Sequence, residues 1–136
     1  MKIVFAGSPE YAVPALEALQ EKFGVAAVIT RPDKPVGRKK ILTPTAVKAR
    51  ALSLGIEVYD FDKIRAHAEE VKNIGADIMV TCAYGQLLTR DILDSFPQGV
   101  WNLHASLLPK FRGASPIQSA ILAGETHTGV TVMKTE

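Results

Sequence analysis

Asn102 and His104 are two polar side chains that could perform acyl-group chemistry, and they stand two places apart near the end of an apolar run. Residues 99–104 are predicted to form a strand, on which alternate side chains point to the same face. An amide N–H can stabilise a developing oxyanion and an imidazole can move a proton, as acyl transfer requires. Structural hydrogen bonds at a strand end remain the alternative for an Asn-x-His triplet considered alone.

Short apolar runs alternate with segments of helical spacing along the whole chain. Strands are predicted at residues 2–6, 25–30, 56–59, 77–82, 99–104 and 129–133. Helices are predicted at residues 12–23, 62–72, 87–96 and 115–122, and one more runs through residue 52 from an N-cap at either Thr43 or Thr45. Six such alternations predict an α/β fold, a doubly wound and mostly parallel sheet with helices on both faces. Ligands of such sheets bind at the carboxyl ends of strands, so the loops after residues 6, 30, 82 and 104 are the candidates.

Length and composition favour one globular domain inside a reducing compartment. The 136 residues are 47% hydrophobic and 22% charged, with a formal net charge of +2. Cys82 is the only cysteine, which excludes an internal disulfide framework and a cysteine-rich metal site. No apolar run approaches the length of a membrane span. We therefore expect a cytoplasmic protein, with Cys82 as a small core residue.

The segment of residues 31–40 is predicted to be a loop from its Pro and Gly content, and it carries most of the clustered positive charge. Lys34, Arg38, Lys39 and Lys40 concentrate that charge on a flexible segment, which is what phosphate attraction needs. A basic loop that is merely solvated is the alternative interpretation.

Asn102-x-His104-x-Ser106-Leu107-Leu108-Pro109, with the Arg-Gly-Ala and Pro-Ile-Gln that follow, resembles the signature of the formyl-tetrahydrofolate transferase family. The resemblance covers essentially the whole chain, including the opening strand and turn, the loop at residues 83–86 and the strand at residues 129–133. It implies a Rossmann-like formyltransferase fold in which Asn102 and His104 are catalytic. It also implies that Ser106, Leu107, Leu108 and Pro109 contact the co-substrate, 10-formyl-tetrahydrofolate, and that no metal is required.

Within that family, residues 31–40 and 43–48 resemble the branch that formylates initiator methionyl-tRNA. The resemblance implies that Lys34, Arg38, Lys39 and Lys40 reach the acceptor arm of the tRNA, and a monomer is expected. A formyltransferase for another amine and a non-catalytic folate- or RNA-binding module remain the alternatives.

The third catalytic residue of the family is an aspartate in an Asp-Thr-Gly loop, which is expected beyond Glu136. Residues 1–136 are accordingly interpreted as a catalytic domain that is incomplete at its C-terminal end. We expect little or no transferase activity from these residues alone.

Overall fold

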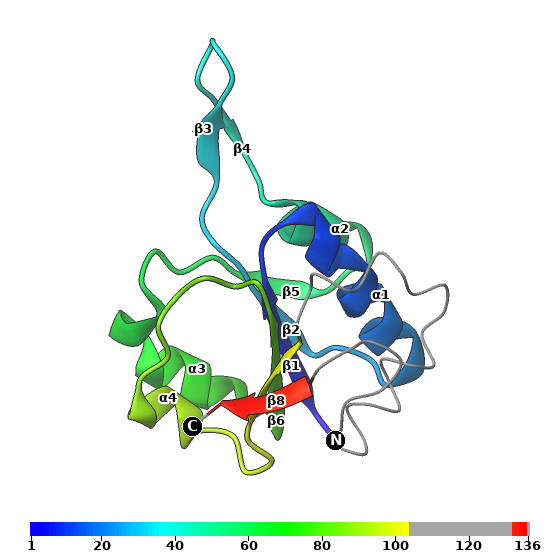
Figure 1. Ribbon diagram of the computed structural model, residues 1–136, viewed down its shortest axis with the longest axis vertical. Coiled ribbons are helices and arrows are strands. Elements are labelled where there is room, and N and C mark those ends of the chain that lie inside the picture. The colour runs from blue at the N-terminus through cyan, green and yellow to red at the C-terminus, as the bar shows by residue number, and fades with distance from the viewer. Residues whose placement is uncertain (104–131, 136) are drawn as a thin grey trace.

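The computed structural model describes residues 1–103 and 132–135, and these form a six-stranded sheet with a small hairpin beside it (Figure 1). The strand order is β5-β2-β1-β6-β7-β8. The strands are β1 (Ile3–Gly7), β2 (Ala27–Ile29), β5 (Glu57–Tyr59), β6 (Ile78–Cys82), β7 (Val100–Leu103) and β8 (Val132–Thr135). The first five of these strands run parallel, and β8 pairs antiparallel with β7.

The two central strands, β1 and β6, are buried along their whole length. They pair in register from Ile3 opposite Ile78 to Gly7 opposite Cys82. Continuous apolar runs of this kind are typical of parallel strands that are covered on both faces. Gly7 is required at the end of β1, because a Cβ atom there would lie 2.7 Å from the carbonyl oxygen of Cys82.

Helices cover both faces of the sheet, as the sequence predicted (Figure 1). One face packs against α1 (Val13–Lys22) and α2 (Ala46–Ser53), and the other against α3 (Ala68–Ile74) and α4 (Arg90–Leu93). Alternation along β1 divides the core: Ile3 and Phe5 belong to the first layer and Val4 and Ala6 to the second. None of the helices that the structure describes has the length and apolar character to cross a membrane.

The helices differ from the prediction in extent. The expected helix at residues 62–72 is a 3-10 turn, η2 (Ile64–Ala66), followed by α3, and a second 3-10 turn, η1 (Glu10–Ala12), precedes α1. The expected helix at residues 87–96 is only the single turn of α4, which ends before Pro97. The expected helix at residues 115–122 lies outside the described residues.

The sixth strand was expected at residues 129–133 of a mostly parallel sheet, without a direction assigned to it. The described part of this strand is Val132–Thr135, and it runs antiparallel, with Val132 opposite Leu103 and Thr135 opposite Val100. Its carboxyl end therefore lies beside the start of β7 and not beside Asn102.

The largest correction concerns the predicted loop at residues 31–40. An antiparallel hairpin, β3 (Lys34–Val36) and β4 (Ile41–Thr43), projects from the body between β2 and α2 (Figure 1). Val36 pairs with Ile41, and β-branched side chains favour extended backbone. Gly37 and Lys40 adopt positive φ angles of 77° and 54° in the connection. The Pro and Gly content that predicted a loop instead marks one strand and its turn.

Candidate active site

The carboxyl edge of the parallel strands holds the polar side chains of the candidate site. The chain leaves β1 toward β2 on one side and later returns to β6 on the other, so the strand order reverses between β1 and β6. A reversal of this kind opens a crevice in which α/β proteins bind ligands. Ser8, Thr30 and Ala83, which follow β1, β2 and β6, meet at this edge.

Asn102 lies at this edge on β7, half-buried and opposite Thr81 of β6. The Thr81 hydroxyl donates a hydrogen bond of 2.9 Å to Asn102 Oδ1. That bond engages the amide oxygen of Asn102. The Nδ2 group has no acceptor among the described residues, so its N–H groups can donate to a ligand. The other predicted site residues after this strand, His104, Ser106, Leu107, Leu108 and Pro109, lie outside the described residues.

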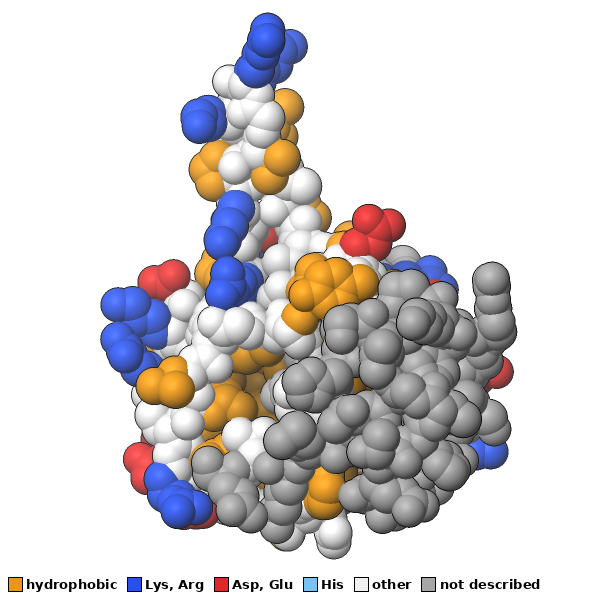
Figure 2. All heavy atoms as spheres, viewed as in Figure 1, with side chains coloured by type: hydrophobic (Ala, Val, Ile, Leu, Met, Phe, Trp, Pro, Cys, Tyr) orange, Lys and Arg blue, Asp and Glu red, His pale blue; other side chains and the backbone are white. Residues whose placement is uncertain are grey.

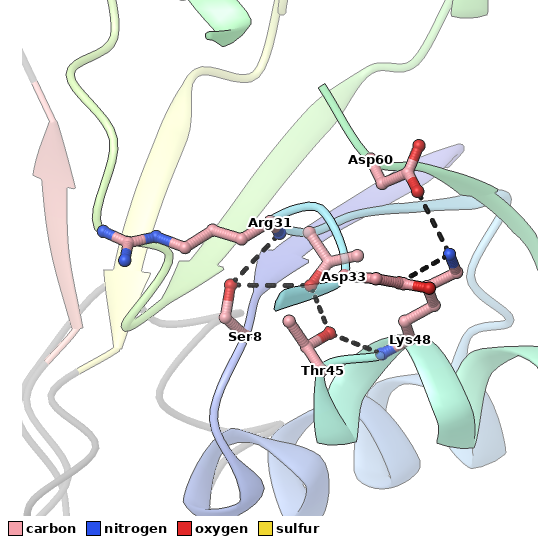
Figure 3. Close-up of polar contacts among 7 residues, drawn as sticks. Ser8, Arg31, Asp33, Thr45, Lys48 and Asp60 are labelled. Atoms are coloured by element: carbon pink, nitrogen blue, oxygen red, sulfur yellow. Dashed lines mark hydrogen bonds and ion pairs between the residues drawn. The ribbon is translucent and has the colours of Figure 1, made fainter. Parts of the chain in front are cut away.

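Three hydroxyl groups form a hydrogen-bonded chain beside the crevice, on its β1–β2 side (Figure 3). Thr30 Oγ1 lies 3.4 Å from Ser8 Oγ and 2.6 Å from Thr45 Oγ1. Thr45 is the N-cap of α2, where its hydroxyl accepts a hydrogen bond of 3.0 Å from the Lys48 N–H. This capping was predicted for Thr43 or Thr45, and the structure selects Thr45. The chain ties the ends of β1 and β2 to the start of α2.

Lys48, in the first turn of α2, joins two acidic side chains from separate segments (Figure 3). Its Nζ lies 2.9 Å from Asp33 Oδ1 and 3.0 Å from Asp60 Oδ2. Hydrogen bonds to the two carboxylates raise the pKa of Lys48 above its ordinary value, and the bond to Asp33 has the larger effect. Sequence reasoning gave Lys48 no separate role, because its partners stand 15 and 12 residues away.

Arg31 connects the start of the hairpin segment to the loop after β6. Its backbone N–H donates to Ser8 Oγ at 3.3 Å, and its side chain extends away from Ser8 (Figure 3). The guanidinium donates to the Gly85 carbonyl at 2.9 Å. Gly85 has a φ of +82°, and a Cβ atom there would lie 2.3 Å from Arg31 Nη2. Only glycine therefore lets the arginine and this loop approach so closely.

The side chain of Gln86, next in the same loop, holds the segment before η2. It accepts from the Ile64 N–H at 2.8 Å and donates to the carbonyl oxygens of Phe61 and Asp62 at 3.3 and 3.0 Å. A small hollow of about 140 Å³ lies beside it, lined by Asp62, Lys63, Ile64, Arg65, Gln86 and Leu87.

A larger hollow of about 420 Å³ opens at the foot of the hairpin. Its lining residues in the described part of the chain are Ser8, Pro9, Arg31, Lys34, Thr45, Ala46 and Ala83. Two of these residues are cationic and none is acidic, so the hollow suits an anionic group. It lies at the carboxyl edge, where the strand order reverses.

The four basic residues singled out from the sequence all lie on the hairpin or in its turn and are exposed. Figure 2 shows that Lys and Arg side chains follow the hairpin and gather at its tip. The exposed apolar residues Val36, Ile41 and Leu42 lie between them. The hairpin therefore presents positive charge well away from the body of the protein.

Cys82 lies beneath the edge and is fully buried, as the sequence predicted. Burial raises the pKa of its thiol to about 12. Burial likewise raises the pKa of Tyr84, whose hydroxyl has no hydrogen-bond partner in the described part of the chain. Residues 1–103 and 132–135 contain no cluster of His, Cys, Asp and Glu that could hold a metal ion.

Solved structures with a similar fold come first in the comparison with known proteins. The structure resembles phosphoribosylglycinamide formyltransferases from Streptococcus pneumoniae (TM-score 0.63, 24% identity, 99% of this chain and 73% of that one) and Bacillus halodurans (TM-score 0.62, 23% identity, 100% and 72%). These identities show the fold alone.

The sequence is 52% identical over 134 residues to a methionyl-tRNA formyltransferase of Listeria innocua and 51% identical to one of Macrococcus caseolyticus. In both comparisons 97% of this chain is covered, and the chain spans 43% of the length of the relative. The model of the formyl transferase family matches residues 1–136. The chain belongs to the formyl transferase family.

Proposed function

We propose that this chain is the formyl-transferring part of an enzyme that moves a formyl group from 10-formyl-tetrahydrofolate to the amino group of initiator methionyl-tRNA. The observation that carries the proposal is the basic hairpin, which rises from the carboxyl edge that also holds Asn102. A protein that acts on a small amine has no need of an exposed cationic arm. An RNA substrate does, because contacts with its phosphates supply a large share of the binding energy.

The chemistry requires a donor for the developing oxyanion and a group that moves a proton. The amine nitrogen attacks the formyl carbon, the new C–N bond forms, and the bond from that carbon to the folate nitrogen breaks. Asn102 Nδ2 donates to the oxyanion while the Thr81 hydroxyl holds the amide oxygen. His104 stabilises the same charge and passes the proton of the amine toward the departing nitrogen. Ser106, Leu107, Leu108 and Pro109 hold the folate.

The larger hollow takes the end of the amine substrate. Arg31 and Lys34 attract a phosphate there, and the Ser8 and Thr45 hydroxyls lie beside them. The hairpin tip then reaches further along the acceptor arm with Arg38, Lys39 and Lys40. The proposed contacts with phosphates position the RNA but do not recognise its base sequence.

The catalytic role is tested in the full-length protein by His104→Ala and Asn102→Ala. Both variants are expected to lower kcat for methionyl-tRNA by about a hundredfold or more while they retain folate binding. Folate binding is measured by fluorescence titration and kcat by formylation of charged initiator tRNA. Unchanged kcat in both variants would favour a non-catalytic binding module.

The choice of substrate is tested by the double variant Arg38→Ala/Lys40→Ala. We expect a rise in KM for tRNA of about tenfold or more, with hydrolysis of the formyl donor unchanged, because each lost cation removes a phosphate contact. Lys22→Ala/Lys72→Ala, which removes two exposed cations far from the hairpin, is the matched control. Equal tRNA kinetics in the two double variants would favour another amine as the substrate.

A further inference from the structure

The direction of the hairpin is set where its two legs enter the body of the protein. Val36, Ile41 and Leu42 are 56%, 61% and 66% exposed, so the side chains of β3 and β4 do not pack against the sheet or its helices. Figure 2 shows the hairpin standing clear of the rest of the surface. An arm without packing along its length depends on the contacts at its base for its angle.

Lys48 makes the ionic contacts at that base. Lys48 is the third residue of α2, the helix that follows β4, the second leg of the hairpin. Its ammonium group pairs with Asp33, which directly precedes β3, the first leg. Asp60, directly after β5 at the same edge of the sheet, anchors the other side of the ammonium group. The two legs are also joined by the hydrogen bond between Thr30 and Thr45.

The ammonium group of Lys48 is engaged by carboxylates and is poorly available to solvent. Two acceptors lie within 3.0 Å of its Nζ, and its side chain is 19% exposed. Lys34 and the cations of the tip, by contrast, are exposed. A lysine neutralised by two carboxylates attracts a phosphate weakly, so contact with RNA is not the role that this geometry suits.

We infer that Lys48, held between Asp33 and Asp60, is a positioning residue that sets the direction of the basic hairpin toward the RNA substrate. This inference rests on the proposed function, since it assigns the alignment of the proposed RNA-binding arm to one ion-paired lysine. Asp33 is the essential partner, because it stands on the hairpin leg itself and Asp60 only fixes the lysine to the body.

The decisive test is Asp33→Asn in the full-length protein, because positioning and phosphate contact predict opposite signs. If Lys48 positions the hairpin, loss of its partner lowers kcat/KM for methionyl-tRNA by about tenfold, mainly through KM. If Lys48 instead binds phosphate, the same change frees its charge, and kcat/KM rises. Asp94→Asn, an exposed acid beside α4, is the matched control and is expected to leave tRNA kinetics unchanged.

Three further measurements separate positioning from a general loss of structure. Lys48→Met is expected to match Asp33→Asn, Lys48→Arg to restore most of the activity, and the double variant Asp33→Asn/Lys48→Met to be no worse than either single variant. Donor hydrolysis and the KM for folate are expected to stay at the wild-type level in all of them.

The salt dependence of KM for tRNA gives an independent readout. Asp33→Asn is expected to leave the slope of log KM against log salt unchanged, since no phosphate contact is lost, whereas Arg38→Ala lowers it by about one. Wild-type or improved tRNA kinetics in Asp33→Asn, alongside a defect in Arg38→Ala/Lys40→Ala, would overturn the positioning role and leave the proposed function standing. Wild-type kinetics in both would overturn both.

Discussion

Cys82 shows how burial alone decides whether a reactive residue type takes part in chemistry. The thiol lies at the end of a central strand, close to the proposed reaction, and its pKa is raised from 9.0 to about 12 because burial disfavours the thiolate. A protonated thiol is a poor nucleophile at neutral pH. The sequence predicted this outcome correctly, since the apolar run that ends at Cys82 implied a buried strand.

The first prediction at this scale concerns that thiol. Native protein at pH 7.5 is expected to react with iodoacetamide far more slowly than protein unfolded in urea, as measured by mass spectrometry. The raised pKa also means that the folded state keeps its proton between about pH 9 and 12 while the unfolded state loses it. The free energy of unfolding should therefore fall as pH rises above 9, and Cys82→Ala should show a shallower fall. Rapid labelling of native protein at pH 7.5 would contradict this.

Tyr84 provides a second prediction, from a hydroxyl group that is buried without a described partner. A buried unpaired hydroxyl costs about 1 to 3 kcal/mol. Tyr84→Phe is therefore expected to raise the free energy of unfolding by about 1 kcal/mol in urea denaturation. Tyr59→Phe, whose hydroxyl bonds the Glu57 carboxylate at an exposed site, is the control and should not stabilise the protein. Destabilisation by Tyr84→Phe would show that the hydroxyl has a partner.

Thr81 marks the limit of prediction at the residue scale. The sequence predicted that Asn102 would point from the carboxyl end of a strand, and the structure places it there. That the amide oxygen would meet Thr81 depends on the order and register of β6 and β7, which pair residues 21 positions apart. No local pattern in the sequence carries that information.

At the scale of elements, the sequence predicted helix and strand boundaries most reliably where a single side chain determines where an element begins. Thr45 was one of two predicted caps, and its hydroxyl accepts from the Lys48 N–H while it also contacts Thr30. Pattern alone failed for the hairpin, because its exposed strands bury nothing and so have no apolar alternation against a core. The helices predicted at residues 62–72 and 87–96 were too long for a related reason. Apolar residues keep helical spacing in the sequence beyond the residues that form the packed helix.

The two candidate caps allow a direct test of the first point. Thr45→Ala is expected to lower the free energy of unfolding by about 1 to 2 kcal/mol, because it removes the N-cap of α2. Thr45→Ser keeps the hydroxyl and should recover most of this loss. Thr43→Ala is the matched control, since Thr43 is exposed and, among the described residues, its hydroxyl bonds only the Ile41 carbonyl. An equal loss in Thr43→Ala and Thr45→Ala would contradict the capping role.

At the scale of the whole molecule, fold class was predictable and sheet order was not. Alternating apolar runs and helical segments predicted layers on both faces of a sheet, which the two core clusters confirm. A mostly parallel sheet was predicted, but which strand runs antiparallel was not, because strand direction depends on the connection that precedes it. The location proposed for the site was predicted from the general rule that ligands of such sheets bind at the carboxyl ends of the strands.

Charge is also distributed unevenly across the molecule. Residues 34–43 contain four of the 16 basic side chains and none of the 14 acidic ones. The rest of the chain therefore contains twelve basic and fourteen acidic side chains. The net charge of +2 thus arises from a hairpin of +4 on a body of −2. Such a distribution attracts a polyanion more strongly to the hairpin than to the rest of the molecule.

This asymmetry predicts how salt affects binding of each proposed substrate by the full-length protein. KM for tRNA should rise steeply between about 50 and 200 mM salt, while KM for the folate donor should change little. Replacing Arg38, Lys39 and Lys40 by Ala should lower the slope of log KM against log salt by about three. The matched control replaces three exposed cations of the body, Lys22, Lys72 and Arg90, by Ala and should leave the slope unchanged. Equal slopes in the two triple variants would mean that the body, and not the hairpin, collects the phosphates.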